Sequence, residues 1–66
     1  MGIDTQKIKS LRKKMGLTQQ QAADRAKLTS RQYWYALEAG HRRNPTVDTL
    51  ERIASALGVK AKDLLK

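Results

Sequence analysis

The stretch TQQQAADRAKLTSRQYWYAL, residues 18–37, contains two helical patterns separated by a short break. Thr18 followed by Gln21 is a capping-box signature for a helix start, and alanines occupy one face of the helix that follows. A turn at residues 27–29, with Leu28 as an apolar plug beneath it, separates this helix from the next. Small alanine side chains let another helix approach closely. The pair therefore suits a helix-turn-helix, in which one helix braces across a DNA backbone and the next enters the major groove. The alternative is an ordinary helical hairpin inside a bundle.

Residues that mark helix ends also occur on both sides of this stretch. Gly16, Gly40 and Gly58 each follow a helical pattern, and Pro45 marks a boundary in the loop between two of them. Strand signals are nearly absent, and no repeat or linker interrupts the chain. We therefore predict a single all-α domain over residues 1–66, a compact bundle of five short helices at about residues 5–15, 18–26, 30–39, 46–57 and 61–65.

Apolar spacing predicts which helix faces turn inward. After the candidate cap Asp4, the residues Ile8, Leu11 and Met15 recur at helical spacing. The fourth helix, beginning around Thr46, has a clearer inward stripe, formed by Leu50, Ile53, Ala54 and Leu57.

Composition excludes several classes of protein. The chain has no cysteine, which removes disulfides, thiolate nucleophiles and sulfur-ligated metal sites, and the single histidine, His41, cannot build a metal site or a triad alone. No apolar run approaches the roughly 18 residues that a membrane span needs. We therefore expect no metal, no cofactor, no enzyme activity and no membrane partner, and a cytoplasmic, nucleoid-associated protein.

The charge is strongly positive and unevenly distributed. Fourteen Lys and Arg residues against six Asp and Glu residues give a net charge of +8. Residues 1–45 carry ten basic and three acidic side chains, whereas residues 46–66 carry four and three. A basic balance suits nucleic acid, an anionic membrane surface or an acidic protein. Its concentration in one part of the chain favours nucleic acid.

The third predicted helix presents two different faces. Trp34 and Leu37 should point into the core, with Tyr33 at the edge of that face. The opposite stripe contains donors and an aromatic ring that suit base edges and phosphates, and its members are Arg31, Gln32, Tyr35 and Ala36. A solvated helix face is the alternative, but it explains the exposed Tyr35 poorly.

The loop after this helix, Gly40–Pro45, is basic and tightly turned. Arg42, Arg43 and Asn44 are candidates for clamping a phosphate beside the groove. The alternative is a solvated loop without a partner.

The order and spacing of these residues resemble the Cro/C1-type (XRE) helix-turn-helix family, whose fold is lambda-repressor-like. The resemblance covers about residues 8–65 and rests on Leu11-Arg12, Gly16-Leu17-Thr18-Gln19, Ala23, Ala26, Leu37-Glu38, Gly40, Arg43-Asn44-Pro45, Thr49-Leu50, Ile53-Ala54 and Leu57-Gly58-Val59. It implies a five-helix fold that binds operator DNA, usually as a two-fold dimer on a pseudo-palindromic site. The function predicted is a sequence-specific transcriptional regulator, acting as a bacterial, phage or mobile-element repressor.

The resemblance also implies roles for single residues. Arg31 and Gln32 would be the principal base readers, with Ala36 one turn further along, and Arg12 would form a buried ion pair with Glu38. Gln19, at the start of the second helix, would contact a phosphate. Together with the loop residues named above, the predicted phosphate contacts are Gln19, Ser30, Tyr33, Arg42, Arg43 and Asn44.

One departure from the family concerns the spacing from Ala26 to Glu38, which is one residue longer than usual. Counting back from Glu38 makes Ser30 the cap of the third helix and Arg31 and Gln32 the readers. Counting forward from Ala26 makes Thr29 the cap and Ser30 and Arg31 the readers. We adopt the first register, and Arg31 is a reader in both.

Two further expectations concern partners. No sensing or oligomerisation domain follows, so a homodimer contact should lie within the weakly charged last third, where the candidates are Val59, Leu64 and Leu65. If those side chains belong to the core, the protein could be a monomer. The competing function is a protein-interaction module, such as an antitoxin or adaptor, for which the consecutive Tyr33, Trp34 and Tyr35 would form an aromatic hot spot.

Overall fold

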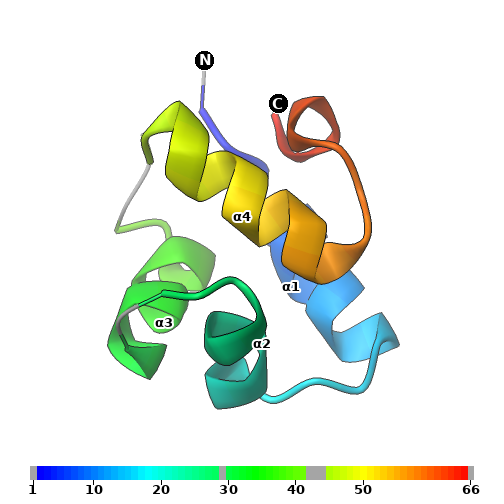
Figure 1. The fold of residues 1–66 in the computed structure, drawn as a ribbon, viewed down its shortest axis with the longest axis vertical. Coiled ribbons are helices and arrows are strands. Elements are labelled where there is room, and N and C mark those ends of the chain that lie inside the picture. The colour runs from blue at the N-terminus through cyan, green and yellow to red at the C-terminus, as the bar shows by residue number, and fades with distance from the viewer. Residues whose placement is uncertain (1, 29, 42–44, 66) are drawn as a thin grey trace.

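A computed structural model describes residues 2–28, 30–41 and 45–65 of the chain (Figure 1). This part of the chain folds into four α-helices and one short 3-10 helix, which are α1 (Thr5–Lys14), α2 (Gln19–Arg25), α3 (Arg31–Ala39), α4 (Val47–Leu57) and η1 (Ala61–Leu64). The helices α2 and α3 pack against each other, α1 contacts α3, and α4 packs across both α1 and α2. The all-α prediction is confirmed for the described residues.

Side-chain caps lie at the starts of the α-helices, and those at Asp4, Thr18 and Ser30 were predicted. The side chains of Asp4, Thr18, Ser30 and Thr46 each accept a hydrogen bond from a backbone N–H in the first turn of α1, α2, α3 and α4. Thr18 and Gln21 form the complete capping box, because the Gln21 side chain also accepts from the Thr18 N–H.

The fifth predicted helix differs from the structure. Residues 61–64 form a 3-10 helix of four residues, and Leu65 is extended, with φ −95° and ψ 143°. Leu65 pairs with Ile3 in an isolated antiparallel β-bridge, and the Asp4 N–H donates to the Leu64 carbonyl over 2.7 Å. A single bridge has no alternating pattern, so no strand signal in the sequence could predict it. The segment just before α1 and the segment at the end of η1 therefore lie side by side (Figure 1).

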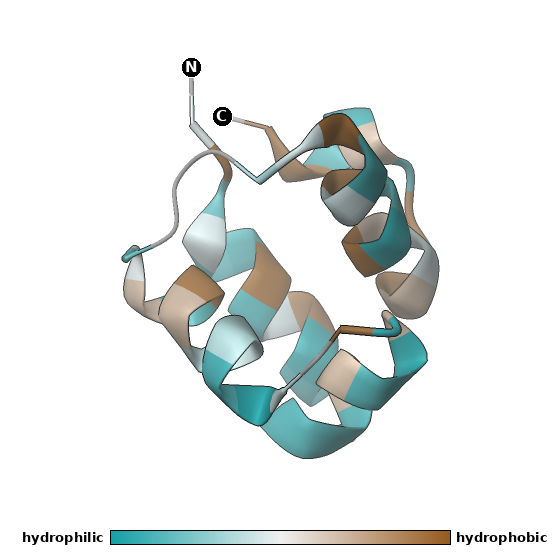
Figure 2. Ribbon diagram, turned by 60° about the vertical axis from the view of Figure 1, so that its left-hand side comes forward, coloured by the Kyte–Doolittle hydropathy of each residue, from teal (hydrophilic) through white to brown (hydrophobic). Residues whose placement is uncertain are grey.

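One core collects the apolar faces of all the helices. The largest fully buried side chains are those of Trp34, Ile8, Leu37, Ile53 and Leu64. Teal and brown segments alternate along the helices, as expected of amphipathic helices with one apolar face (Figure 2). The inward stripe of α4 is confirmed, because Leu50, Ile53, Ala54 and Leu57 are all buried.

The prediction for the inner face of α1 was wrong at one position. Met15 lies beyond the end of α1 and is 40% exposed, whereas Arg12 within the helix is buried. An apolar pattern assigns a charged residue to solvent by default, so only the partner of Arg12 explains its burial.

The C-terminal ends of α2 and α3 have the same capping geometry but use different residues. At the end of α3, Gly40 has φ 83° and the His41 N–H donates to the Ala36 carbonyl. At the end of α2, Lys27 takes this left-handed position with φ 58°, and the Leu28 N–H donates to the Ala23 carbonyl. This is the Schellman pattern, in which glycine is preferred because a Cβ atom is strained at positive φ. Lys27 therefore carries backbone strain at the turn between α2 and α3.

This strain predicts opposite effects of two substitutions. Lys27→Gly should raise the free energy of unfolding by about 1 kcal/mol, because glycine relieves the positive φ. Gly40→Ala should lower it by about the same amount, since a Cβ there meets no atom within 4 Å and the cost is backbone strain alone. Thermal unfolding followed by circular dichroism should show shifts of about 4–8 °C in opposite directions. A fall in melting temperature for Lys27→Gly would contradict the assignment.

Candidate nucleic-acid interface

The stripe predicted on the outer side of α3 is accessible. Arg31 and Gln32 are exposed at the first two positions of the helix, and Tyr35 is 57% exposed one turn later. Ala36 is half-buried at the edge of the stripe. On the opposite side, Trp34 and Leu37 are fully buried in the core. The helix thus has one buried face that holds it in place and one polar face that is available to a partner.

The register of α3 follows from its cap. The Ser30 hydroxyl accepts from the Tyr33 N–H over 3.4 Å, and α3 begins at Arg31, as the count back from Glu38 predicted. The extra residue lies before the cap, where Lys27 reverses the chain and Leu28 packs against the core. Thr29, the alternative cap, lies outside the described residues. The consequence is that Arg31 and Gln32 occupy the N-terminal end of α3.

Three of the six predicted phosphate contacts belong to the described residues. Gln19 opens α2 and is half-buried, because its side-chain amide donates to Glu38 Oε1 over 3.2 Å. Ser30 caps α3, and Tyr33 is half-buried against the core. The remaining candidates, Arg42, Arg43 and Asn44, lie outside the described residues.

A carboxylate at the end of α3 joins three helices. Arg12 of α1 donates to both oxygens of Glu38, from Nε to Oε2 over 2.5 Å and from Nη2 to Oε1 over 3.1 Å. The Trp34 indole N–H also donates to Oε2, and the Gln19 amide to Oε1. The Glu38 side chain is only 4% exposed, and that of Arg12 only 11%. The ion pair implied by the family resemblance is therefore present, in a bidentate geometry that is among the stronger kinds of hydrogen bonding.

Arg12 also ties α1 to the start of α2. Its Nη1 donates to the Leu17 carbonyl over 2.8 Å, just before the cap of α2. The described residues contain no buried side-chain nitrogen or oxygen without a hydrogen-bond partner. The buried charges are thus fully paired, which is the condition for tolerating them in a small core.

Two of the contacts to Glu38 were not predicted from the sequence. Trp34 and Glu38 are four residues apart on α3, a spacing that places side chains on one helix face, so this contact had a readable signal. The contact from Gln19 had none, because it depends on how α2 packs against α3. A further contact between distant segments, from Arg25 Nε to the Ala56 carbonyl over 3.2 Å, ties α2 to α4.

Comparisons with known proteins agree with this geometry. The sequence profile of the helix-turn-helix family matches residues 8–64. The chain belongs to the Cro/C1-type (XRE) helix-turn-helix family. Members of this family are DNA-binding transcriptional regulators and are typically not enzymes.

Two relatives cover most of the domain. The immunity repressor protein of Bacillus phage phi105 is 43% identical over 60 residues, which are 91% of this chain and 40% of the phage protein. The HTH-type transcriptional regulator y4dJ of Sinorhizobium fredii is 49% identical over 55 residues, or 83% of this chain and 69% of that protein. The chain thus spans about two fifths of the phage repressor and about two thirds of the rhizobial regulator.

Two solved structures share the fold. SinR, the master regulator for biofilm formation, in complex with DNA superposes with a TM-score of 0.87 at 28% identity, over 97% of this chain and all of that one. A SinR–SinI protein complex superposes with a TM-score of 0.86 at 28% identity, over 97% of this chain and 61% of that one.

The burial of several side chains bears on the predicted aromatic hot spot and on the predicted dimer contact. Trp34 is fully buried between two partly accessible tyrosines, so the three consecutive aromatic residues do not form a continuous surface hot spot. Leu64 is fully buried within the single chain and presents no surface to a second copy. Leu65 is 40% exposed and Val59 is half-buried against the core, and a role for these two in a dimer stays a prediction.

None of the helices in the described part of the chain has the length and hydrophobicity that a membrane span requires. The same residues include no group of three His, Cys, Asp or Glu side chains placed to hold a metal ion.

The surroundings of Glu38 shift the pKa of its carboxyl group. Burial alone would raise the pKa of the Glu38 carboxyl, but the hydrogen bonds from Arg12, Trp34 and Gln19 and the charge of Arg12 outweigh it and hold the pKa below its ordinary value. The folded state therefore releases this proton more readily than the unfolded state. The stabilisation is fully present above the ordinary pKa of about 4.3 and is lost as the pH falls through the lower folded pKa.

Two substitutions test this cluster. Glu38→Gln leaves the charge of Arg12 buried without its counter-ion and should lower the free energy of unfolding by about 3 kcal/mol at neutral pH. It should also reduce the loss of stability in acid, because the group that titrates is gone. Asp48→Asn is a control, since Asp48 pairs with Arg52 on the surface with 73% of its side chain exposed and should change stability by about 0.5 kcal/mol or less. Urea titrations between pH 3 and 7 measure both, and equal effects of the two substitutions would refute the cluster's role.

Proposed function

We propose that this domain is a sequence-specific, double-stranded DNA-binding transcriptional regulator that acts as a repressor. The observation that carries the proposal is the outer face of α3, where Arg31, Gln32 and Tyr35 are exposed while Trp34 and Leu37 anchor the helix from below. Arginine binds guanine bidentately, and glutamine does the same for adenine, so this face suits the major groove. Family membership supports the proposal, as do the phage immunity repressor among the relatives and the SinR structure that contains DNA.

The affinity has two physically distinct sources in this proposal. The net charge of +8 supplies a phosphate term that is independent of sequence and weakens as salt rises. Arg31, Gln32 and Tyr35, with Ala36 at the edge of the stripe, supply discrimination between base pairs. The loop residues Arg42, Arg43 and Asn44 and the residues Gln19, Ser30 and Tyr33 belong to the phosphate term.

Binding as a homodimer is part of the same proposal. Two copies related by a two-fold axis place two α3 helices in successive major grooves, so the operator should contain half-sites about one helical turn apart. Val59 and Leu65 are the candidates for the contact between copies. A location in the cytoplasm, at the nucleoid, follows from this function.

Selection from a pool of random duplexes at about 150 mM salt tests the function directly. Sequencing of the bound fraction should recover a two-fold-symmetric motif. Recovery of unselected DNA only, bound weakly and lost as salt rises, would reduce the charge to non-specific attraction and reject sequence-specific recognition.

Single substitutions test the division of roles on the selected site. Arg31→Ala should cost about 1–3 kcal/mol of binding free energy on the cognate duplex and relax the preference at one base position. Arg42→Ala should weaken all sequences alike and reduce the salt slope by about one. Fluorescence anisotropy on cognate and scrambled duplexes distinguishes the two, and equal losses from Arg31→Ala on both duplexes would exclude it as a base reader.

A further inference from the structure

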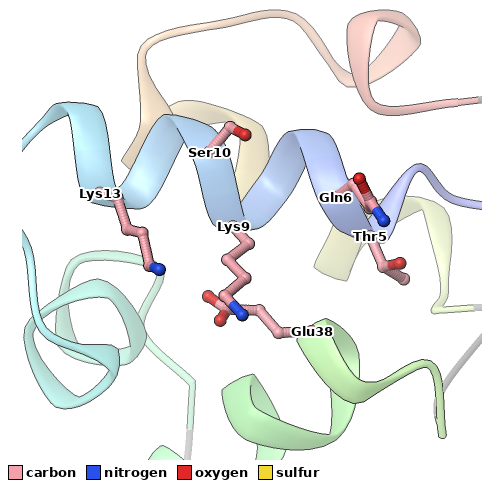
Figure 3. A pocket seen from close by; sticks show the side chains of 6 residues that line it. All are labelled: Thr5, Gln6, Lys9, Ser10, Lys13 and Glu38. Atoms are coloured by element: carbon pink, nitrogen blue, oxygen red, sulfur yellow. The ribbon is translucent and has the colours of Figure 1, made fainter.

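A polar groove runs between α1 and the outer side of α3. Its volume is about 450 Å³, and its lining includes Lys9 and Lys13 of α1, Gln19 of α2, and Tyr35 and Ala39 of α3. A neighbouring hollow of about 360 Å³ shares the same two lysines and continues along α1 toward its N-terminal end. Figure 3 shows Lys9 and Lys13 extending from α1 toward the side where α3 carries Glu38.

The groove carries a net positive charge. Arg12 and Glu38 also line it, but they neutralise each other, and the Glu38 side chain is only 4% exposed. Lys9 and Lys13 are exposed, and neither forms an ion pair with any other described residue. Two ammonium groups one helical turn apart thus face an open polar space, and no carboxylate of the described residues lies within ion-pair distance of either.

The groove places these lysines beside the exposed face of α3. Arg31, Tyr35 and Ala39 recur at four-residue spacing and form one row along α3. Tyr35 and Ala39 belong both to this row and to the wall of the groove. A duplex that receives Arg31 and Tyr35 in its major groove must therefore bring one of its flanking backbones past the mouth of this groove.

We propose that Lys9 and Lys13 bind consecutive phosphates of the DNA strand that flanks the major groove occupied by α3. The proposal rests on the DNA-binding function proposed above and adds a second helix, α1, to the contact surface. The buried Glu38 cluster gives this surface a fixed geometry, because it holds α1, the start of α2 and the end of α3 together. The lysines contribute affinity but no discrimination, since phosphates are the same in every sequence.

The chain provides a matched control on the same helix. Lys7 and Lys14 are also exposed on α1, but neither lines the groove. The pairs K9Q/K13Q and K7Q/K14Q remove the same charge, and each contains one residue from the last turn of α1, so effects on the helix itself are matched. A solvated face without a partner would make the two pairs equivalent.

Salt titrations of binding to the selected duplex and to a scrambled one provide the test. K9Q/K13Q should reduce the slope of log K against log salt by about two and weaken both duplexes by the same factor, because each phosphate contact contributes about 0.9 to the slope. K7Q/K14Q should leave the slope close to that of the unaltered protein, and K9R/K13R should restore it. Equal slopes for K9Q/K13Q and K7Q/K14Q would overturn the proposal.

Ethylation interference then locates the contact. In the unaltered protein, ethylation of phosphates on one strand beside the bases read by α3 should block binding, and K9Q/K13Q should abolish this interference at those phosphates alone. An unchanged interference pattern would also overturn the proposal.

Failure of this inference is distinguishable from failure of the proposed function. If the unaltered protein selects a motif but K9Q/K13Q keeps the full slope, only the inference about α1 fails. If it binds duplexes without preference, sequence-specific recognition fails, and the slopes on random DNA still decide the role of the lysines. A protein that binds no duplex at low salt would overturn both. Melting curves for all variants verify that each one is folded.

Discussion

The buried carboxylate of Glu38 is the constraint on which the rest of the structure depends. It accepts hydrogen bonds from three helices, through Arg12 of α1, Gln19 of α2 and Trp34 of α3 itself. Taking such charges out of water is costly, and a buried pair often adds little net stability compared with apolar residues of the same size. Its effect is selective, because any packing that separates Arg12 from Glu38 leaves an unpaired charge in the core. We infer that the cluster contributes more to the specificity of the helix arrangement than to the net stability of the fold.

This choice has a direct consequence for the outer surface. Trp34 and Leu37 occupy the core side of α3, so the rotation of the helix about its axis is set, and Arg31, Gln32 and Tyr35 are left on the accessible side. The bond from Gln19 to Glu38 adds a constraint between α2 and α3, the two helices of the motif. Base recognition requires side chains placed to within fractions of an ångström, so a surface held from beneath by paired charges suits that task better than a mobile one.

The turn between α2 and α3 shows how the fold accommodates a departure from its family. The additional residue that the family resemblance implies would lie outside α3, because Ser30 caps the helix directly before Arg31. The chain reverses at Lys27, where the backbone takes a left-handed conformation that glycine would adopt more readily. Among the described residues of this turn, Lys27 alone has a positive φ, and it is exposed, while Leu28 packs against the core beyond it. Variation at this turn therefore alters the connection and not the surface that α3 presents.

The sequence by itself determined the local features of this protein. The cap at Thr18, the glycine after α3 and the stripe of α4 depend on interactions within a few residues, so spacing alone predicts them. The cap of α3 was open between Thr29 and Ser30 until the family resemblance, counted back from Glu38, favoured Ser30. The burial of Arg12 was implied by the family resemblance but not by the apolar spacing of α1. Only the tertiary structure decided the exposure of Met15, the bridge between Ile3 and Leu65, and the 3-10 geometry of the last turn. Each of these depends on a partner far along the chain, or on a packing that periodicity does not encode. The groove with Lys9 and Lys13 belongs to the same class, because a lysine on a helix becomes part of a site only when another helix supplies the opposite wall.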